Sequence, residues 1–244
     1  MNNREASSVS DEASFDTCWD RFRMNVLVLA PHPDDEVLGC GGTIGRHVAA
    51  GDSVFVLVAT RGMPELYPDD AIEVVRAEAL AAHRKLGVTE TRFLDFPAPA
   101  LDTVPRYKLA GAVSDSIRDF SPNLIYLPHH GDIHSDHFHL HQAALVAARP
   151  LEDSPVKRIL AYETLSETEW APPQMDAVFY PTVFIDVSDF LQQKLDAMSC
   201  FESQVKEPPN ARSLRNITAL AHYRGATVAC DAAEGFMLIR EIIS

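Results

Sequence analysis

The sequence predicts an α/β fold, because short apolar runs alternate with longer amphipathic stretches along most of its 244 residues. Two of these runs, 26–30 and 124–127, are apolar at every position, which is typical of strands buried on both faces of a sheet. Each of the two is followed by a proline and then by a cluster of charged side chains. Because crossovers between parallel strands are right-handed, this alternation predicts a Rossmann-like three-layer sandwich with a mainly parallel sheet.

Capping residues and turn residues bound the expected elements. We expect strands at about 25–30, 54–59, 91–96, 124–127, 158–162 and 183–187. We expect helices ending at Gly51 and Gly87, the second beginning at Asp69, and further helices over about 107–120, up to 148, over 189–203 after a Ser188 cap, and over 214–222. A loop is expected over 61–68, and the segment 234–243 fits either a strand or a helix.

Composition excludes several classes of protein. A formal net charge of -14 and a pI near 5.0 argue against partners such as nucleic acid or an anionic membrane surface. The sequence has no apolar run near the roughly 20 residues of a membrane span. Its first 20 residues are polar and acidic, unlike a secretory signal, and its four cysteines are scattered. We therefore expect a cytoplasmic protein, with residues 1–22 as a flexible lead-in and 23–244 as a single domain.

Two clusters of histidine and acidic side chains follow the two buried runs. The first contains His32, Asp34 and Asp35, and the second contains His134, Asp136 and His137. Since ligands of open α/β sheets bind beyond the carboxyl ends of the strands, both clusters can reach one crevice. Two imidazoles and one carboxylate, with a position left open for water, form a ligand set of catalytic zinc. A second carboxylate beside the metal can accept the proton of that water, which explains why two adjacent aspartates are useful.

Each cluster also has a simpler explanation. Asp34 and Asp35 could cap the following helix, and histidines in a loop are often just solvated. The glycines that follow, in Gly39-Cys-Gly-Gly, do not fit the dinucleotide pattern G-x-G-x-x-G, and the preceding acids would repel a pyrophosphate. The presence of both clusters, each at the end of a predicted buried strand, favours a metal site.

These residues also carry a resemblance to a known family. The stretch 30–42, Ala-Pro-His-Pro-Asp-Asp-Glu-Val-Leu-Gly-Cys-Gly-Gly, together with His134-Ser-Asp-His137, resembles the LmbE-like (PIG-L) family of zinc-dependent N-deacetylases. The similarity covers most of the chain from about residue 24. It implies a Rossmann-like fold and a reaction that removes acetyl groups from amino sugars or their conjugates. It also implies that the chain can form a homo-oligomer, since members of this family often form rings of subunits.

The resemblance implies a role for each residue of the two clusters. His32, Asp35 and His137 would hold one zinc per chain, or another divalent metal, and Asp34 would be the general base. His134, supported by Asp136, would face the tetrahedral intermediate. A carboxylate beside an imidazole favours its charged form, so we expect His134 to be protonated. Arg61, after the second strand, is the expected substrate contact.

Two other functions use the same residue types. Two histidines and one carboxylate can form the facial triad of a non-haem Fe(II) oxygenase, although we expect those enzymes on β scaffolds rather than on a parallel α/β sheet. A module that binds a sugar or a metal without turnover is the second alternative. Such a module would not need Asp34 as a carboxylate that is not a ligand. Loss of activity without loss of metal on changing Asp34 would separate an enzyme from a binding module.

Overall fold

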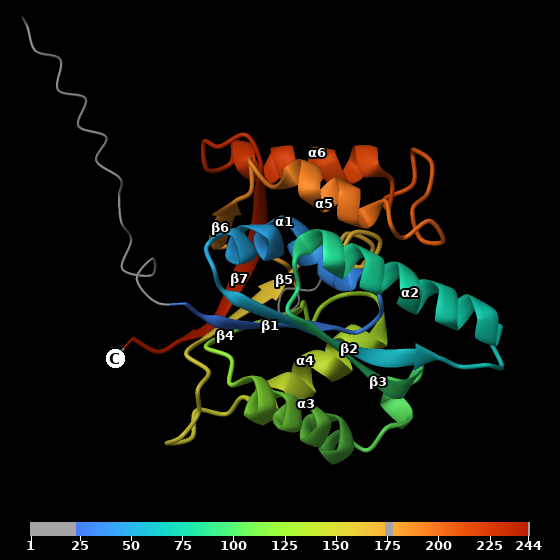
Figure 1. Ribbon diagram of the computed structural model, residues 1–244, viewed down its shortest axis with the longest axis vertical. Coiled ribbons are helices and arrows are strands. Elements are labelled where there is room, and N and C mark those ends of the chain that lie inside the picture. The colour runs from blue at the N-terminus through green and yellow to red at the C-terminus, as the bar shows by residue number, and fades with distance from the viewer. Residues whose placement is uncertain (1–22, 174–177, 244) are drawn as a thin grey trace, which may run out of the picture.

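Seven strands form one sheet between two layers of helices (Figure 1). The computed structural model describes residues 23–173 and 178–243, so the predicted lead-in over 1–22 lies outside the described residues. The elements are β1 (Asn25–Ala30), α1 (Asp35–Ala49), β2 (Ser53–Gly62), α2 (Asp69–Leu86), β3 (Glu90–Ala98), the 3-10 helix η1 (Leu101–Thr103), α3 (Arg106–Phe120), β4 (Leu124–Pro128), α4 (Ser135–Ala147), β5 (Arg158–Tyr162), β6 (Val183–Asp186), α5 (Leu191–Met198), α6 (Leu214–Ala226) and β7 (Ala233–Glu241).

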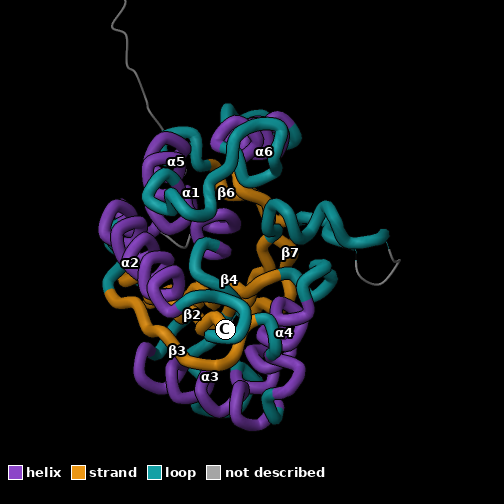
Figure 2. Tube along the Cα trace, turned by 90° about the vertical axis from the view of Figure 1, so that its right-hand side faces the viewer, coloured by secondary structure: helices purple, strands orange, loops and turns teal. Residues whose placement is uncertain are grey.

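The sheet is mainly parallel, which confirms the predicted fold class. The strand order is β3-β2-β1-β4-β5-β7-β6, and the first five strands of the chain pair in parallel. The segment that fitted either a strand or a helix is β7, which pairs antiparallel with both β5 and β6. Viewed from the side, the strands lie between helices above and below (Figure 2). No helix within residues 23–173 or 178–243 is long and apolar enough to cross a membrane.

The central strand β1 separates two hydrophobic cores. Val26 and Val28 pack into the core beneath α1, α2 and α5, whereas Leu27 and Leu29 pack into the core above α3 and α4. All four side chains are fully buried. Because neither face of β1 meets water, its sequence is continuously apolar rather than alternating.

Several elements have other bounds than the sequence-based expectation; for example, α6 runs to Ala226 instead of ending near residue 222. Strand β2 runs on to Gly62 instead of ending near Ala59, because Arg61 and Gly62 still pair with β3. Helix α5 begins at Leu191 and ends at Met198, so it is shorter than the expected helix over 189–203. Ser188 does not cap the helix, because the N-cap residue is Phe190 and the Ser188 hydroxyl oxygen accepts from the backbone N–H of Ala232 at 3.2 Å.

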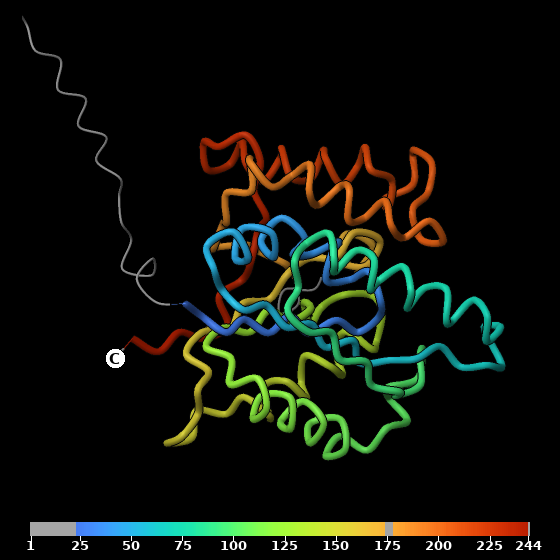
Figure 3. Tube along the Cα trace, viewed as in Figure 1, coloured from blue at the N-terminus to red at the C-terminus, as the bar shows by residue number. Residues whose placement is uncertain are grey.

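Helix α1 is held by groups from the last third of the chain, which lies against it in Figure 3. A Cβ added to Gly39 would lie 2.3 Å from the Tyr162 ring, so the helix passes very close to β5. Glu234 of β7 accepts hydrogen bonds from the backbone N–H groups of Gly42 and Thr43, at 3.0 and 2.7 Å. Lys194 of α5 pairs with Glu234 and donates to the carbonyl of Leu38. This buried ion pair, the α1 clamp, fixes the middle of α1 relative to the sheet.

Candidate metal centre and active site

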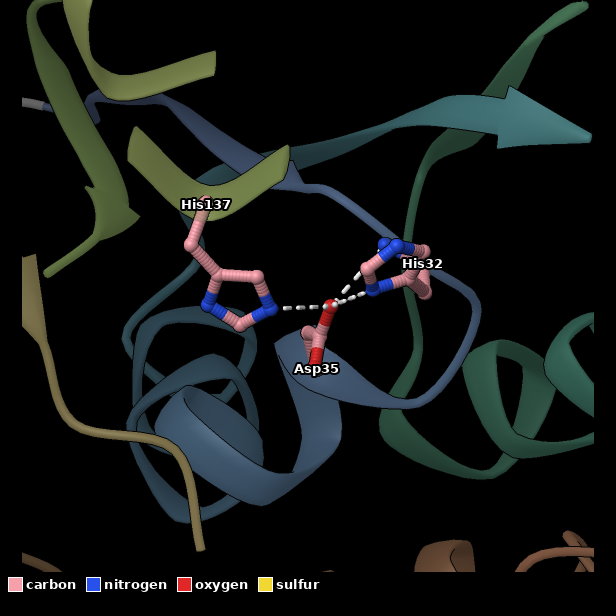
Figure 4. Close-up of side chains that lie close together, drawn as sticks. All are labelled: His32, Asp35 and His137. Carbon is pink, nitrogen blue, oxygen red and sulfur yellow. Dashed lines mark hydrogen bonds and ion pairs between the residues drawn. The ribbon is translucent and has the colours of Figure 1, made fainter. Parts of the chain in front are cut away.

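The two predicted clusters meet at the carboxyl ends of neighbouring strands β1 and β4. His32 follows β1, Asp35 is the first residue of α1, and His137 lies in the first turn of α4. The Asp35 Oδ2 atom lies 3.2 Å from His32 Nδ1 and 3.4 Å from His137 Nε2 (Figure 4). The three ligating atoms lie within 4.8 Å of one another, so the structure brings together the three side chains predicted to hold a metal.

The three residues fit a divalent metal. Within the described part of the chain, Asp35 Oδ1 and His137 Nε2 are buried and have no hydrogen-bond partner. Buried polar atoms of this kind are rare in proteins and need an explanation. Two imidazole nitrogens and one carboxylate oxygen at one point are a donor set that zinc accepts, with room for a further ligand.

The charges of the site favour a cation. Burial alone would lower the pKa of His137, but Asp35 and Asp132 outweigh it and raise the pKa to about 10. Burial also opposes protonation of His32, yet hydrogen bonds to Asp136 and Asp35 raise its pKa to about 9. Burial tends to raise the pKa of Asp35, whereas the two imidazoles hold it well below its ordinary value. The carboxylates thus stabilise positive charge at the point where a metal would lie.

Two further carboxylates orient the ligands. The Asp132 carboxylate lies 2.7 Å from His137 Nδ1 and accepts a hydrogen bond from the Thr168 hydroxyl at 2.6 Å. A carboxylate behind a metal-binding imidazole fixes its tautomer and ring orientation. Asp132 was not among the site residues predicted from the sequence. Its position five residues before His137, in the same charged cluster, is the signal from which it could have been predicted.

The contacts of the Asp136 carboxylate differ from those expected. It was expected to support His134, but its carboxylate lies 3.2 Å from His32 Nε2 and accepts the backbone N–H of Leu101 at 2.9 Å. Only the backbone N–H of Asp136 reaches His134, because His134 is the N-cap residue of α4 and its Nδ1 accepts that group at 3.2 Å. Asp136 therefore orients a proposed metal ligand rather than the imidazole of His134.

His134 consequently has a defined tautomer. Its Nδ1 accepts a hydrogen bond, so the ring proton is on Nε2. Burial, together with the neighbouring charge of His32, lowers the pKa of His134 to about 4. The expected protonated form is therefore not favoured here, because burial and the charge of His32 outweigh the nearby Asp136 carboxylate, which raises the pKa of His134. A neutral His134 still carries one N–H donor.

Asp34 lies beside the ligands with an unusual backbone conformation. Its φ of 113° and ψ of -26° are rare for any residue other than glycine. Its side chain is 2% exposed and accepts a hydrogen bond from Arg212 Nη1 at 2.9 Å. Burial, opposed by Arg212 and reinforced by the carboxylates of Asp35 and Glu36, raises the pKa of Asp34 to about 8. Arg212 was not predicted as a site residue, because it lies in the loop before α6 without any recognisable motif.

A cavity of about 430 Å³ opens above these residues. Its lining includes His32, Asp34 and His134, together with Arg61 and Arg212. Apolar side chains from α2 and the loop before it also line it, among them Tyr67, Ile72 and Val75. Arg61 also lies 3.4 Å from both Asp69 and Glu73, and its predicted contact with substrate stays a prediction.

A protein-family model matches the part of the chain that contains both clusters. The model of PIG-L, described as GlcNAc-PI de-N-acetylase, matches residues 27–148, which is half of the chain and contains both clusters. The chain belongs to the PIG-L (LmbE-like) deacetylase family. This confirms the resemblance found in the sequence.

Curated relatives agree with this membership. The chain is 31% identical over 158 residues to the 1D-myo-inositol 2-acetamido-2-deoxy-alpha-D-glucopyranoside deacetylase of Kineococcus radiotolerans, with 50% of this chain and 44% of that protein covered. It is 29% identical to the uncharacterized deacetylase YaiS of Escherichia coli, covering 74% of this chain and 92% of that protein. It is 25% identical to the 2'-N-acetylparomamine deacetylase of Streptomyces fradiae, covering 87% and 86%.

Solved structures share the fold of this chain. The conserved protein TT1542 of Thermus thermophilus has a TM-score of 0.74 and 28% identity, with 91% of this chain and 97% of that chain covered. The 4-carboxy-2-hydroxymuconate hydratase GalB of Pseudomonas putida has a TM-score of 0.68 and 20% identity, with 91% and 98% covered. Since a hydratase shares the fold, the fold alone does not identify the reaction.

Proposed function

We propose that this protein is a zinc-dependent N-deacetylase that hydrolyses the acetamide of an amino sugar or an amino-sugar conjugate. The observation that carries the proposal is a carboxylate, Asp34, that faces the cavity beside a His32–Asp35–His137 metal site without being one of its ligands. A site built only to bind a metal or a sugar would not need that carboxylate. The names of the relatives from Kineococcus and Streptomyces, both deacetylases of acetamido sugars, support the same reaction.

The proposed cofactor is one zinc per chain, held by His32, Asp35 and His137, although these donors also accept other divalent metals. A bound zinc ion supplies Lewis-acid chemistry, which lowers the pKa of water and polarises the acyl carbonyl. Asp132 and Asp136 keep the two imidazoles in the ligating orientation through their hydrogen bonds.

Asp34 and His134 carry out the proton transfer and charge stabilisation in this scheme. In its ionised form, which Arg212 and a bound cation would favour against the effect of burial, Asp34 accepts a proton as water attacks the acyl carbon, and Arg212 keeps its carboxylate oriented. The Nε2–H of His134 donates to the oxyanion, which a neutral imidazole with this tautomer can do. When the C–N bond breaks, the proton on Asp34 passes to the departing nitrogen. The products are acetate and the free amino sugar.

The cavity supports a substrate of sugar size. Its volume of about 430 Å³ lies within the range of small-molecule sites. Arg61 offers a hydrogen-bond donor to sugar hydroxyls, and the apolar wall of α2 offers a surface for the face of a ring. The oxygenase alternative has no support from the scaffold, because the sheet is mainly parallel and the chain belongs to a deacetylase family.

A deacetylation screen tests the proposal. The zinc-loaded protein is incubated with N-acetylglucosamine, N,N'-diacetylchitobiose, 2'-N-acetylparomamine and the acetylated glucosaminyl inositol, and released acetate and free amine are both measured. At least one compound should give equal amounts of the two products. Asp34→Asn should reduce turnover about 10² to 10⁴-fold while keeping its zinc, because it retains the shape of Asp34 but cannot accept the proton. Turnover near the parental rate in this variant, or no acetate from any compound, would contradict the proposal.

A further inference from the structure

The conformation of Asp34 needs support from its surroundings. A backbone φ of 113° places its Cβ in a region that residues other than glycine avoid. The carbonyl of Asp34 accepts the first hydrogen bonds of α1, from the N–H groups of Val37 and Leu38 at 3.0 and 2.9 Å. These bonds fix the peptide group that follows Asp34. They do not fix the preceding peptide group, which carries the Asp34 N–H, and the angle between the two groups decides where the carboxyl group points.

Glu36 contacts that N–H group. Its Oε2 atom accepts a hydrogen bond from the backbone N–H of Asp34 at 3.2 Å. Glu36 is completely buried, and its side chain is absent from the lining of the catalytic cavity. It therefore contacts the backbone of Asp34 and does not contact a substrate.

The other oxygen of Glu36 is anchored in α2 and β3. Glu36 Oε1 lies 2.9 Å from His83 Nε2, and His83 Nδ1 lies 2.8 Å from the Thr91 hydroxyl. His83 is 2% exposed and lies in the last turn of α2, and Thr91 lies in β3. A carboxylate can only accept, so His83 donates from Nε2 and can accept from Thr91 at Nδ1. Three consecutive hydrogen bonds thus connect the peptide of Asp34 to two rigid elements.

We propose that Glu36 and His83 are positioning residues that hold Asp34 in its strained conformation, so that its carboxyl group faces the reaction site. The proposal rests on the proposed function in that Asp34 is the group positioned for proton transfer. Relaxation of the peptide would turn the carboxyl group away from the cavity, while His32, Asp35 and His137 would still hold the metal. Loss of the contact between Glu36 and His83 should therefore reduce kcat and leave KM and zinc content nearly unchanged.

Four variants separate positioning from folding. Glu36→Ala and His83→Leu remove the connection, whereas Glu36→Gln and His83→Gln keep side chains that can bridge the same partners. His47 provides a matched control, because both of its ring nitrogens are also bonded, to Asp52 at 2.7 Å and to the Tyr126 hydroxyl at 2.9 Å. It lies near the far end of α1. His47→Leu should lower thermal stability without changing kcat.

The measurements are kcat, KM and zinc content, using the acetylated sugar that the parental enzyme hydrolyses best. Glu36→Ala and His83→Leu should lose about 10- to 100-fold in kcat, the usual effect of removing a partner behind a functional residue. The two glutamine variants should recover most of that loss, and KM should change less than about threefold. Unchanged kcat in the two disrupting variants, or an equal loss in His47→Leu, would overturn the proposal.

Amide exchange gives a readout that does not depend on activity. The N–H of Asp34 should exchange with solvent at least about tenfold faster in Glu36→Ala and His83→Leu than in the parental protein and in His47→Leu. If His83→Leu does not fold, Thr91→Val is measured in its place. This variant keeps the side-chain shape but removes the hydroxyl that contacts His83, so it should still accelerate the exchange. Exchange at the parental rate in every folded variant would refute positioning. A parental protein that releases no acetate would instead refute the proposed function and leave the exchange result to decide on positioning.

Discussion

Replacing Asp34 by glycine should give a more stable fold than replacing it by alanine. Both changes remove the carboxyl group and its 2.9 Å contact with Arg212, so they differ only in the Cβ that the φ of 113° disfavours. Strain of this kind costs about 1–3 kcal/mol, and the extra freedom of glycine in the unfolded chain offsets about 0.5–1 kcal/mol of the gain. At the middle of both ranges, the free energy of unfolding should therefore be about 1 kcal/mol higher for Asp34→Gly than for Asp34→Ala.

Thermal unfolding measures this difference. For a chain of this size, 1 kcal/mol corresponds to about 2–4 °C, so Asp34→Gly should melt about 2–4 °C above Asp34→Ala. Zinc raises the stability of any variant that binds it, so both proteins are compared after chelation and again at one fixed zinc concentration. A melting temperature of Asp34→Ala equal to or above that of Asp34→Gly would show that the backbone at this position is not strained, and the reasoning would fail.

Three further outcomes follow from the geometry. His137→Ala should lose most of the bound zinc, since only two protein ligands remain; full metal retention, measured by atomic absorption, would exclude the assignment. Asp132→Asn should weaken zinc affinity about 10- to 100-fold in a competition titration with a chelator. A neutral amide accepts the hydrogen bond from His137 Nδ1 more weakly than a carboxylate does. Burial tends to raise the pKa of Asp52, but hydrogen bonds from His47 and the backbone N–H of Met24 lower it. Asp52 therefore stabilises the fold above its unfolded pKa near 3.8, and this stabilisation disappears as the pH falls through the lower folded value. Asp52→Asn should thus be about 1 kcal/mol less stable than the parental protein at pH 7 in urea, and a deficit that persists unchanged at pH 3 would contradict this.

The convergence of the three proposed metal ligands could be predicted from sequence because they lie in two short segments that each follow a buried strand. The strands β1 and β4 are neighbours in a parallel sheet, so their carboxyl ends bring His32, Asp35 and His137 to one point without any knowledge of side-chain rotamers. The partners of the carboxylates were harder to predict. Asp136 could turn towards either of two imidazoles, and only the start of α4 at Ser135 decides that its carboxylate reaches His32.

Contacts between distant parts of the chain could not be predicted at all. Arg212 lies 178 residues after Asp34, in a loop whose path depends on the packing of α5 and α6. The contact of Glu36 with His83 likewise depends on how α2 packs on α1. The single domain over 23–244, the cytoplasmic location and the homo-oligomer stay predictions.

The α1 clamp has a consequence for the order in which the site can form during synthesis. Residues 27–148 carry every proposed metal ligand, yet Lys194 and Glu234, which hold the middle of α1, come much later in the sequence. Strand β7 follows the other six strands in the chain but lies between β5 and β6, so the sheet cannot close before β7 has left the ribosome. A nascent chain that already contains His32, Asp35 and His137 therefore still lacks the clamp on the helix that carries Asp35. The proposed metal site can reach its final geometry only after residue 234 has emerged.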